Sequence, residues 1–144
     1  MNASHLVINS NKWFSAVSDY SFQLTRYLQN SDPQSVLFCG HEASPLRGKV
    51  STIGGNFAVL PLLPAGVFSF FRSWRKLTQL LKNEVAENAV VWTFEGREHS
   101  LCTLHKVFHA KLWAKKTLVR VRGQAQPLKG NAINKWVYAR ATDK

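Results

Sequence analysis

The sequence predicts an α/β fold built as a single domain over residues 1–144, and three observations support this prediction. Short apolar runs alternate with longer amphipathic stretches along the whole chain, a pattern typical of strands separated by helices. A chain of 144 residues has the length that one hydrophobic core requires. Hydrophobic residues make up 45% of the chain and charged residues only 19%, which excludes a disordered protein.

The first half of the chain is expected to hold three strands and a long helix. The runs "HLVIN" (5–9), "SVLFCG" (35–40) and "NFAVLPL" (56–62) are short and apolar, and Pro61 suits the end of the third strand. After the second strand, a polar stretch up to Gly55 is predicted as a loop or a short helix. Between the first two strands, apolar side chains at helical spacing predict an amphipathic helix: Val17, Tyr20, Leu24, Tyr27 and Leu28.

The second half of the chain continues the alternation with two further strands. These are "AVVWTF" (89–94) and "TLVRVRG" (117–123), joined by a helix over about 98–109. A last helix is expected after Asn131, a residue type that caps helix N-termini. The helix before the fourth strand is predicted from a stripe of Phe70, Trp74, Leu77 and Leu81, and the last helix from Ile133, Trp136, Val137 and Arg140.

Strands separated by helices of this length imply right-handed crossovers and a parallel sheet with helices on both faces. We therefore expect a Rossmann-like, three-layer α/β/α fold with a parallel sheet of about five strands. In such sheets, ligands bind at the carboxyl ends of the strands, where helix N-termini and loop amides gather.

The remaining general features indicate a reduced, intracellular environment and no resident metal. Cys39 and Cys102 lie far apart without a CxxC partner, so both are predicted to be buried thiols. The N-terminal apolar run is too short for a signal peptide, and no run approaches the roughly 20 residues of a membrane span, so we expect a cytoplasmic protein. His105 and His109 are four residues apart, but no carboxylate or thiol is spaced to complete a metal site.

The charge of the chain is strongly basic and uneven. The formal net charge is +11, and residues 71–144 carry fifteen Lys or Arg against five Asp or Glu. This asymmetry points to an anionic partner, namely a membrane surface, nucleic acid or a phosphorylated substrate, although a merely soluble basic surface is the simplest alternative. Nucleic acid is disfavoured because no nucleic-acid-binding signature is present. The candidate membrane or anion contacts are Arg72, Arg75, Lys76, Lys115 and Lys116.

The candidate site lies in "VVWTFEGREHS" (90–100), where the fourth strand gives way abruptly to charged residues. Glu95, Arg97 and His99 follow the strand directly and so fall at its carboxyl end. Glu98 has a simpler explanation, since an acidic residue in a first helical turn complements the helix dipole.

A second part of the site is expected at the end of the fifth strand. Arg120 and Arg122 are two residues apart and share one face of that strand, which is costly unless they reach its open carboxyl end. Arg122, with Gln124 nearby, is the candidate contact to an anionic ligand, and an ion pair with Glu95 or Glu98 is the alternative. We therefore predict that Glu95, His99 and Arg122 line one cleft.

Several strings resemble the N-terminal domain of family-4 glycosyltransferases, which belong to the two-domain GT-B class. The strings are "HLVINSNKWFSAVSDYSFQLTRYLQ", "AVVWTFEGREHSL" and "TLVRVRGQAQPLKGNAINKWVYARATDK", and they cover most of the chain. The chain departs from the family where many relatives carry a Gly-Gly pair after strand one and a His-x-His string at the end of strand four. Here those places hold residues 13–16, "WFSA", and Trp92 with Phe94.

The resemblance implies a domain that binds the acceptor of a sugar transfer. The acceptor would be a glycan or a lipid-linked molecule in polysaccharide biosynthesis. The protein itself would be cytoplasmic or peripheral at the inner face of the membrane. No cofactor is expected in this domain. The nucleotide-sugar donor would bind a C-terminal domain or separate subunit that the 144 residues do not include, so the isolated chain would be inactive. The acceptor-binding candidates are Ser10, Trp13, Arg97, His99, Arg122 and Gln124. In place of the missing histidine, Glu95 or His99 would position the acceptor or accept the proton of the attacking sugar hydroxyl, and Glu95 is the candidate catalytic residue.

Overall fold

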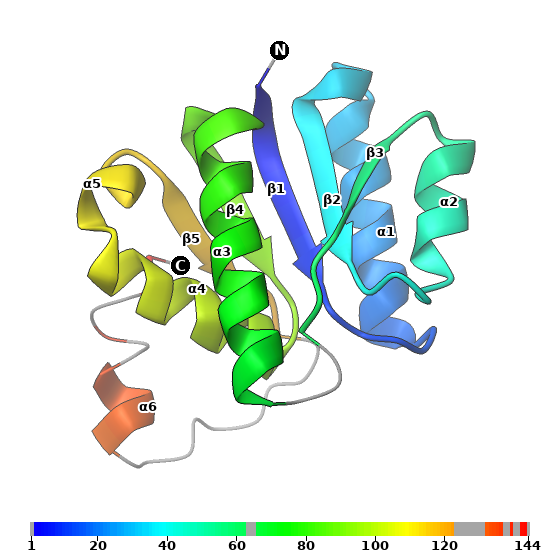
Figure 1. Ribbon diagram of the computed structural model, residues 1–144. Helices are drawn as coiled ribbons and strands as arrows, with labels where there is room; N and C mark the ends of the chain where they lie inside the picture. The colour runs from blue at the N-terminus through cyan, green and yellow to red at the C-terminus, as the bar shows by residue number, and fades with distance from the viewer. Residues whose placement is uncertain (1, 63–65, 123–131, 137–138, 140–141, 144) are drawn as a thin grey trace.

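A computed structural model describes residues 2–62, 66–122, 132–136, 139 and 142–143 of the chain. Its centre is a five-stranded, all-parallel sheet with the strand order β3-β2-β1-β4-β5 (Figure 1). The strands are β1 (Ala3–Asn9), β2 (Val36–Gly40), β3 (Asn56–Val59), β4 (Val85–Thr93) and β5 (Thr117–Arg120). The helices are α1 (Ala16–Gln29), the 3₁₀ helix η1 (Pro33–Ser35), α2 (Leu46–Thr52), α3 (Val67–Asn83), α4 (Gly96–Phe108), α5 (Ala110–Trp113) and α6 (Ala132–Trp136).

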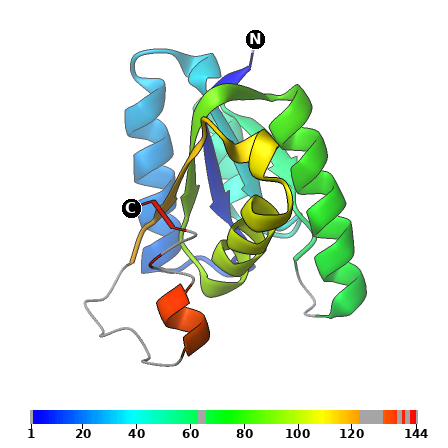
Figure 2. The ribbon, with the colours of Figure 1, turned by 90° about the vertical axis from the view of Figure 1, so that its left-hand side faces the viewer.

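Helices cover the two faces of the sheet, so the fold has three layers (Figure 2). Side chains along a strand point alternately to opposite faces. Leu6 and Ile8 of β1 accordingly join the core under α3, α4 and α5, while Val7 between them joins the core under α1 and α2. The prediction of a Rossmann-like α/β/α fold with a parallel sheet of about five strands is confirmed.

Element boundaries differ from the sequence prediction mainly in β4. This strand begins at Val85, four residues before the predicted start, because Val85 already pairs with Ala3 of β1. The register shifts after this pair, and regular pairing of the two strands resumes at His5. The polar stretch after β2 forms the short helix α2, and Gly54 in the following turn has a φ of 72°, which favours glycine. Asn131, Val137 and Arg140, which were predicted to belong to the last helix, lie outside the described residues.

Helix α1 buries only part of the stripe that its apolar spacing predicts, since Val17, Leu24 and Leu28 pack half-buried against the core. Tyr20 and Tyr27 are exposed, whereas Ser18, Ser21 and Thr25 are buried against the sheet. Small side chains let the helix approach the sheet closely, and Ser21 and Thr25 satisfy their hydroxyls by donating to carbonyls one turn earlier. The prediction that the two tyrosines belong to the inward stripe is therefore wrong.

A buried hydrogen-bond network joins α3, α4 and α5 around His105. The indole N–H of Trp113 donates to His105 Nδ1 at 2.9 Å, and His105 Nε2 lies 2.8 Å from Thr78 Oγ1. The Thr78 hydroxyl itself donates to the carbonyl of Trp74, so it receives the proton of His105 Nε2. Burial, reinforced by the charge of the stacked His109, lowers the pKa of His105 to about 4. The network therefore needs the neutral imidazole.

Within the described part of the chain, no helix combines the length and the apolar character that crossing a bilayer requires.

Candidate functional site

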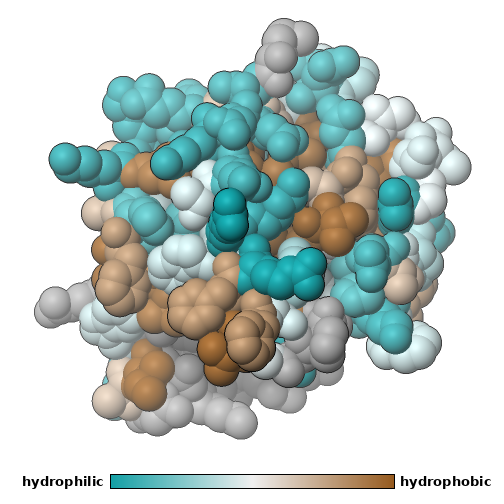
Figure 3. Space-filling model, viewed as in Figure 1, coloured by the Kyte–Doolittle hydropathy of each residue, from teal (hydrophilic) through white to brown (hydrophobic). Residues whose placement is uncertain are grey.

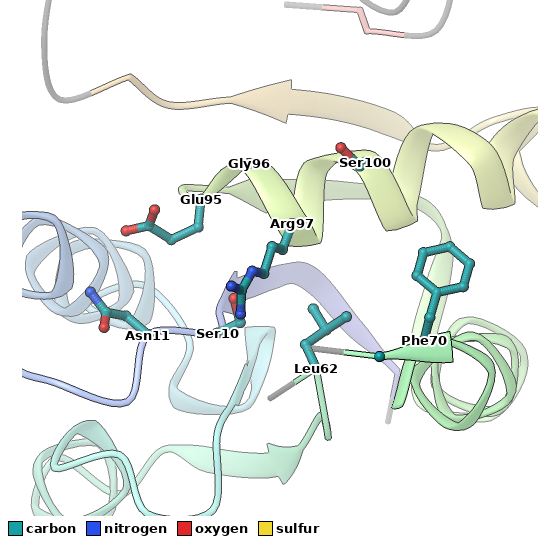
Figure 4. A pocket seen from close by; sticks show the side chains of 9 residues that line it. Ser10, Asn11, Leu62, Phe70, Glu95, Gly96, Arg97 and Ser100 are labelled. Atoms are coloured by element: carbon teal, nitrogen blue, oxygen red, sulfur yellow. The ribbon is translucent and has the colours of Figure 1, made fainter. Parts of the chain in front are cut away.

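A pocket of about 670 Å³ opens at the carboxyl ends of β1 and β4 (Figure 4). The chain leaves β1 toward β2 on one side, while β4 pairs with β1 on the other, so the strand order reverses here. This reversal is where open α/β sheets bind ligands. We call it the switch-point pocket, and its lining residues are Ser10, Asn11, Leu62, Gly66, Phe70, Glu95, Gly96, Arg97 and Ser100.

Asparagine side chains shape the loop between β1 and α1, which forms one wall of the pocket. The Asn9 side-chain oxygen accepts from the Asn11 N–H at 3.0 Å, and the Asn11 side-chain oxygen accepts from the Trp13 N–H at 3.1 Å. The Asn11 amide also donates to Ser15, the N-cap of α1. Such asparagine turns replace backbone hydrogen bonds, so this loop keeps a defined course without the Gly-Gly pair of the resembled family.

Glu98 ties this loop to the start of α4. Its side chain is fully buried, and one carboxylate oxygen accepts from the Ser10 N–H at 2.6 Å. The other oxygen accepts from the N–H groups of Phe94 and Glu95 at 2.7 and 2.8 Å. Glu98 thus holds together the ends of two adjacent strands, and its bonds fix the backbone of two lining residues, Ser10 and Glu95.

Two opposing effects set the ionisation of Glu98. Burial raises the pKa of its carboxyl to about 7, while the hydrogen bonds from Glu95, Phe94 and Ser10 lower it. All three backbone groups are donors, so each is satisfied best by the ionised form.

Glu95 and Arg97 both line the pocket, as the sequence suggested. Glu95 is the N-cap of α4 and forms a capping-box pair with Glu98, and its half-buried carboxylate points toward Asn11 in Figure 4. Arg97 is exposed, and its side chain extends toward Ser10 (Figure 4). A carboxylate and a guanidinium therefore face one polar cavity.

His99 does not line the switch-point pocket, contrary to the sequence prediction. Its ring is buried on the other side of α4, with Nδ1 lying 3.0 Å from Thr93 Oγ1 and Nε2 lying 2.9 Å from Thr142 Oγ1. Burial, together with the charge of Arg120, lowers the pKa of His99 to about 4. The helical turn explains the error, since residues 97 and 99 differ by two positions and project to opposite sides of a helix.

Arg120 reaches the turn that carries Glu95. Its Nη1 donates to the main-chain carbonyl of Glu95 at 2.5 Å. Arg122 is exposed, lies two residues beyond the end of β5 and is not among the pocket residues. The predicted cleft of Glu95, His99 and Arg122 is therefore wrong, and Gln124 lies outside the described residues.

The other predicted contacts occupy separate surfaces. Trp13 is exposed beside Lys12 in the loop after β1, outside the switch-point pocket. Lys115 is exposed and pairs with Glu87 at 3.1 Å. Lys116 is buried, and its ammonium donates to the Leu112 carbonyl, so the prediction that it contacts a membrane or anion is wrong. Arg72, Arg75 and Lys76 lie on α3 and line another pocket.

Asn11, Phe70 and Ser100 also line the pocket and Glu98 anchors it, although the sequence predicted none of these roles. Phe70 belongs to an apolar stripe that looked like core, and Asn11 and Ser100 carry no pattern of their own. Glu98 had a usable signal, because acidic residues at the N-cap and three positions later form a capping box.

The described residues contain no group of three or more His, Cys, Asp or Glu side chains that would hold a metal ion. His105 and His109 each accept an indole N–H, from Trp113 and Trp74. These two rings therefore serve as hydrogen-bond acceptors in the core.

No protein-family model matches the chain, and neither a curated protein nor a solved structure matches it. The resemblance to family-4 glycosyltransferases therefore rests on the sequence strings and stays a prediction.

Proposed function

We propose that the switch-point pocket binds the acceptor of a glycosyltransferase, a glycan or lipid-linked molecule that receives a sugar. One observation carries this proposal: a pocket of about 670 Å³, within the size range of small-molecule sites, lies where the strand order of the sheet reverses. The sugar chemistry comes from the resemblance of the strings around β1, β4 and β5. A nucleotide-sugar donor would bind a second domain or subunit.

The lining of the pocket suits a ligand that is rich in hydroxyl groups. Arg97 supplies hydrogen-bond donors, Glu95 supplies acceptors, and the ring of Phe70 offers an apolar surface beside them. Glu95 is also positioned as the general base that would accept the proton of an attacking hydroxyl. The neutral, buried His99 is unsuited to that task because both of its ring nitrogens are engaged.

Removing the Arg97 side chain should weaken sugar binding. We expect Arg97→Ala to lower the affinity for a bound saccharide by about tenfold, the loss typical of one charge-assisted hydrogen bond. Saturation-transfer NMR of the chain with a panel of monosaccharides and short oligosaccharides measures this. Arg47→Ala removes an exposed arginine from α2, outside the pocket, and serves as the matched control. Absence of binding to every saccharide, or equal losses in both variants, would show the proposal to be wrong.

A second candidate function is reversible binding to an anionic membrane surface, and the outer face of α3 favours it. Phe68 and Phe71 are exposed there, and Arg72 and Arg75 continue the same face of the helix. In Figure 3, hydrophobic side chains gather at the lower end of α3 and hydrophilic ones lie above them. Aromatic residues beside basic ones are typical of helices that rest on anionic lipid.

The membrane candidate predicts a loss of binding when the two phenylalanines are made polar. We expect Phe68→Ser with Phe71→Ser to lower partitioning onto anionic vesicles by about tenfold or more, because the aromatic rings no longer leave water. Vesicle flotation with and without anionic lipid, at low and high salt, gives the measurement. Tyr20→Ser with Tyr27→Ser removes two exposed rings from α1 and is the control. Vesicle binding that does not depend on salt concentration or on lipid charge would contradict a membrane-binding function.

A further inference from the structure

Another pocket, of about 570 Å³, lies between α3 and the carboxyl ends of β2 and β3. We call it the β2–β3 pocket. It is separate from the switch-point pocket, with which it shares no lining residue. Its lining residues are His41, Glu42, Val59, Pro61, Ser69, Arg72, Arg75, Lys76 and Gln79.

One wall of the β2–β3 pocket is a polar stripe of α3. Arg72, Arg75 and Lys76 are three and four positions apart, so they share one side of the helix, and Ser69 and Gln79 extend that side by a turn in each direction. A core-facing helix stripe would be apolar. This side of α3 therefore presents three cations and two hydrogen-bonding side chains to the cavity.

Among the residues that the structure describes, none forms an ion pair with the three cations of this pocket. Within the described ranges, the ion pairs are Lys106 with Asp143 and Lys115 with Glu87, and neither pair involves the pocket. Glu42 is the single acidic residue in the lining, so the positive charges exceed the negative ones. Like charges three or four residues apart on a helix destabilise it slightly. An anionic ligand would remove this repulsion.

The opposite wall offers a hydrogen-bond donor of fixed orientation. His41 follows β2 directly, and its Nδ1 accepts the backbone N–H of Ala43 at 3.0 Å. The proton of the imidazole therefore resides on Nε2, which is left to donate to a ligand. Arginine guanidinium groups bind phosphate oxygens in a bidentate manner, and lysine adds a point charge.

We infer that the β2–β3 pocket binds a phosphate monoester, held by Arg72, Arg75 and Lys76. The phosphate belongs either to a small soluble molecule or to a lipid headgroup. This site requires neither sugar transfer nor the insertion of Phe68 and Phe71 into a membrane.

The test uses the whole chain, with inorganic phosphate and glycerol 3-phosphate as soluble probes and phosphatidylcholine vesicles with or without phosphatidic acid as the lipid probe. Calorimetry and vesicle flotation report binding. We expect Arg75→Gln to lower the affinity for the bound probe by about tenfold, and the triple variant Arg72→Gln, Arg75→Gln, Lys76→Gln to lose measurable binding. The matched control removes three exposed charges elsewhere, through Arg26→Gln, Lys82→Gln and Lys111→Gln.

Each pattern of results has one meaning. Binding of a soluble probe that is lost only in the pocket triple supports a site for small phosphorylated molecules. Binding only to phosphatidic acid vesicles, again lost only in the pocket triple, supports a lipid headgroup. The inference is overturned if no probe binds, or if the control triple weakens binding as much as the pocket triple, since net charge would then explain the effect. Arg97→Ala is expected to leave phosphate binding unchanged, which separates this site from the sugar pocket.

Discussion

Glu98→Ala should lower the free energy of unfolding by about 3 kcal/mol or more, because it leaves buried backbone donors without a partner. The N–H groups of Ser10, Phe94 and Glu95 all donate to this carboxylate, and alanine offers them no acceptor. For a chain of this size, such a loss corresponds to a fall in Tm of about 10 °C. Urea unfolding and thermal melting followed by circular dichroism give the two measurements.

Two further variants test whether Glu98 acts as a buried anchor or only as an ordinary helix cap. Glu95→Ala removes the neighbouring, half-buried carboxylate at the N-cap and should cost only about 1 kcal/mol. The loss of stability in Glu98→Gln should lie between those of Glu98→Ala and Glu95→Ala. The amide oxygen of glutamine still accepts a hydrogen bond, but its NH₂ group faces a backbone N–H donor. If Glu98→Ala were no less stable than Glu95→Ala, the anchoring role of Glu98 would be excluded.

The stability of the protein should fall by about 2 kcal/mol as the pH is lowered from about 6.5 to about 5. The pKa values of His99 and His105 are about 4 in the folded protein, below the ordinary 6.5, so the unfolded chain takes up their protons first. Their contribution is complete above pH 6.5 and is lost as the pH falls toward 4. The pKa of Glu98, raised from 4.5 to about 7, acts in the opposite direction over this interval. The unfolded chain gains two protons at the histidines and loses one at Glu98 relative to the folded protein, so it binds about one more proton in this pH interval.

The slope of stability against pH tests whether His105 contributes to this pH dependence, even if a variant is less stable overall. His105→Gln keeps an acceptor for Trp113 and a donor for Thr78 but cannot titrate, so the slope should decrease by about one proton. Gln34→Ala removes an exposed side chain that carries no proton-binding group, and it should leave the slope unchanged. Urea unfolding at several pH values provides the slopes, and an unaltered slope in His105→Gln would falsify the assignment.

The sequence predicted the layers of the fold well because alternation of strand and helix depends on local pattern. The runs around Leu6, Leu37 and Val91 are continuously apolar, as strands buried on both faces must be. The same reasoning failed in part for α1, where Tyr20 and Tyr27 are exposed and Ser18, Ser21 and Thr25 are buried. Hydrophobicity alone does not reveal that small polar side chains allow close packing, since their hydroxyls are satisfied only once the helix has formed.

The candidate site was predictable only in part, for a related reason. Sequence position placed Glu95 and Arg97 at the carboxyl end of β4, because strand ends in a parallel sheet meet at one edge. It did not reveal that Glu98 would face Ser10, which lies 88 positions earlier in the chain, or that His99 would turn away from the pocket.

By itself, the sequence determined the α/β alternation, the basic second half and the charged turn after β4, because each is a property of neighbouring residues. The tertiary structure alone decided which side chains share a cavity. Which side chains of α4 face the pocket depends on how α4 packs beside the end of β1, where Glu98 accepts the Ser10 N–H. The gathering of Arg72, Arg75 and Lys76 opposite His41 depends on where α3 packs beside β2 and β3. Both are long-range outcomes of core packing, so no local pattern encodes them.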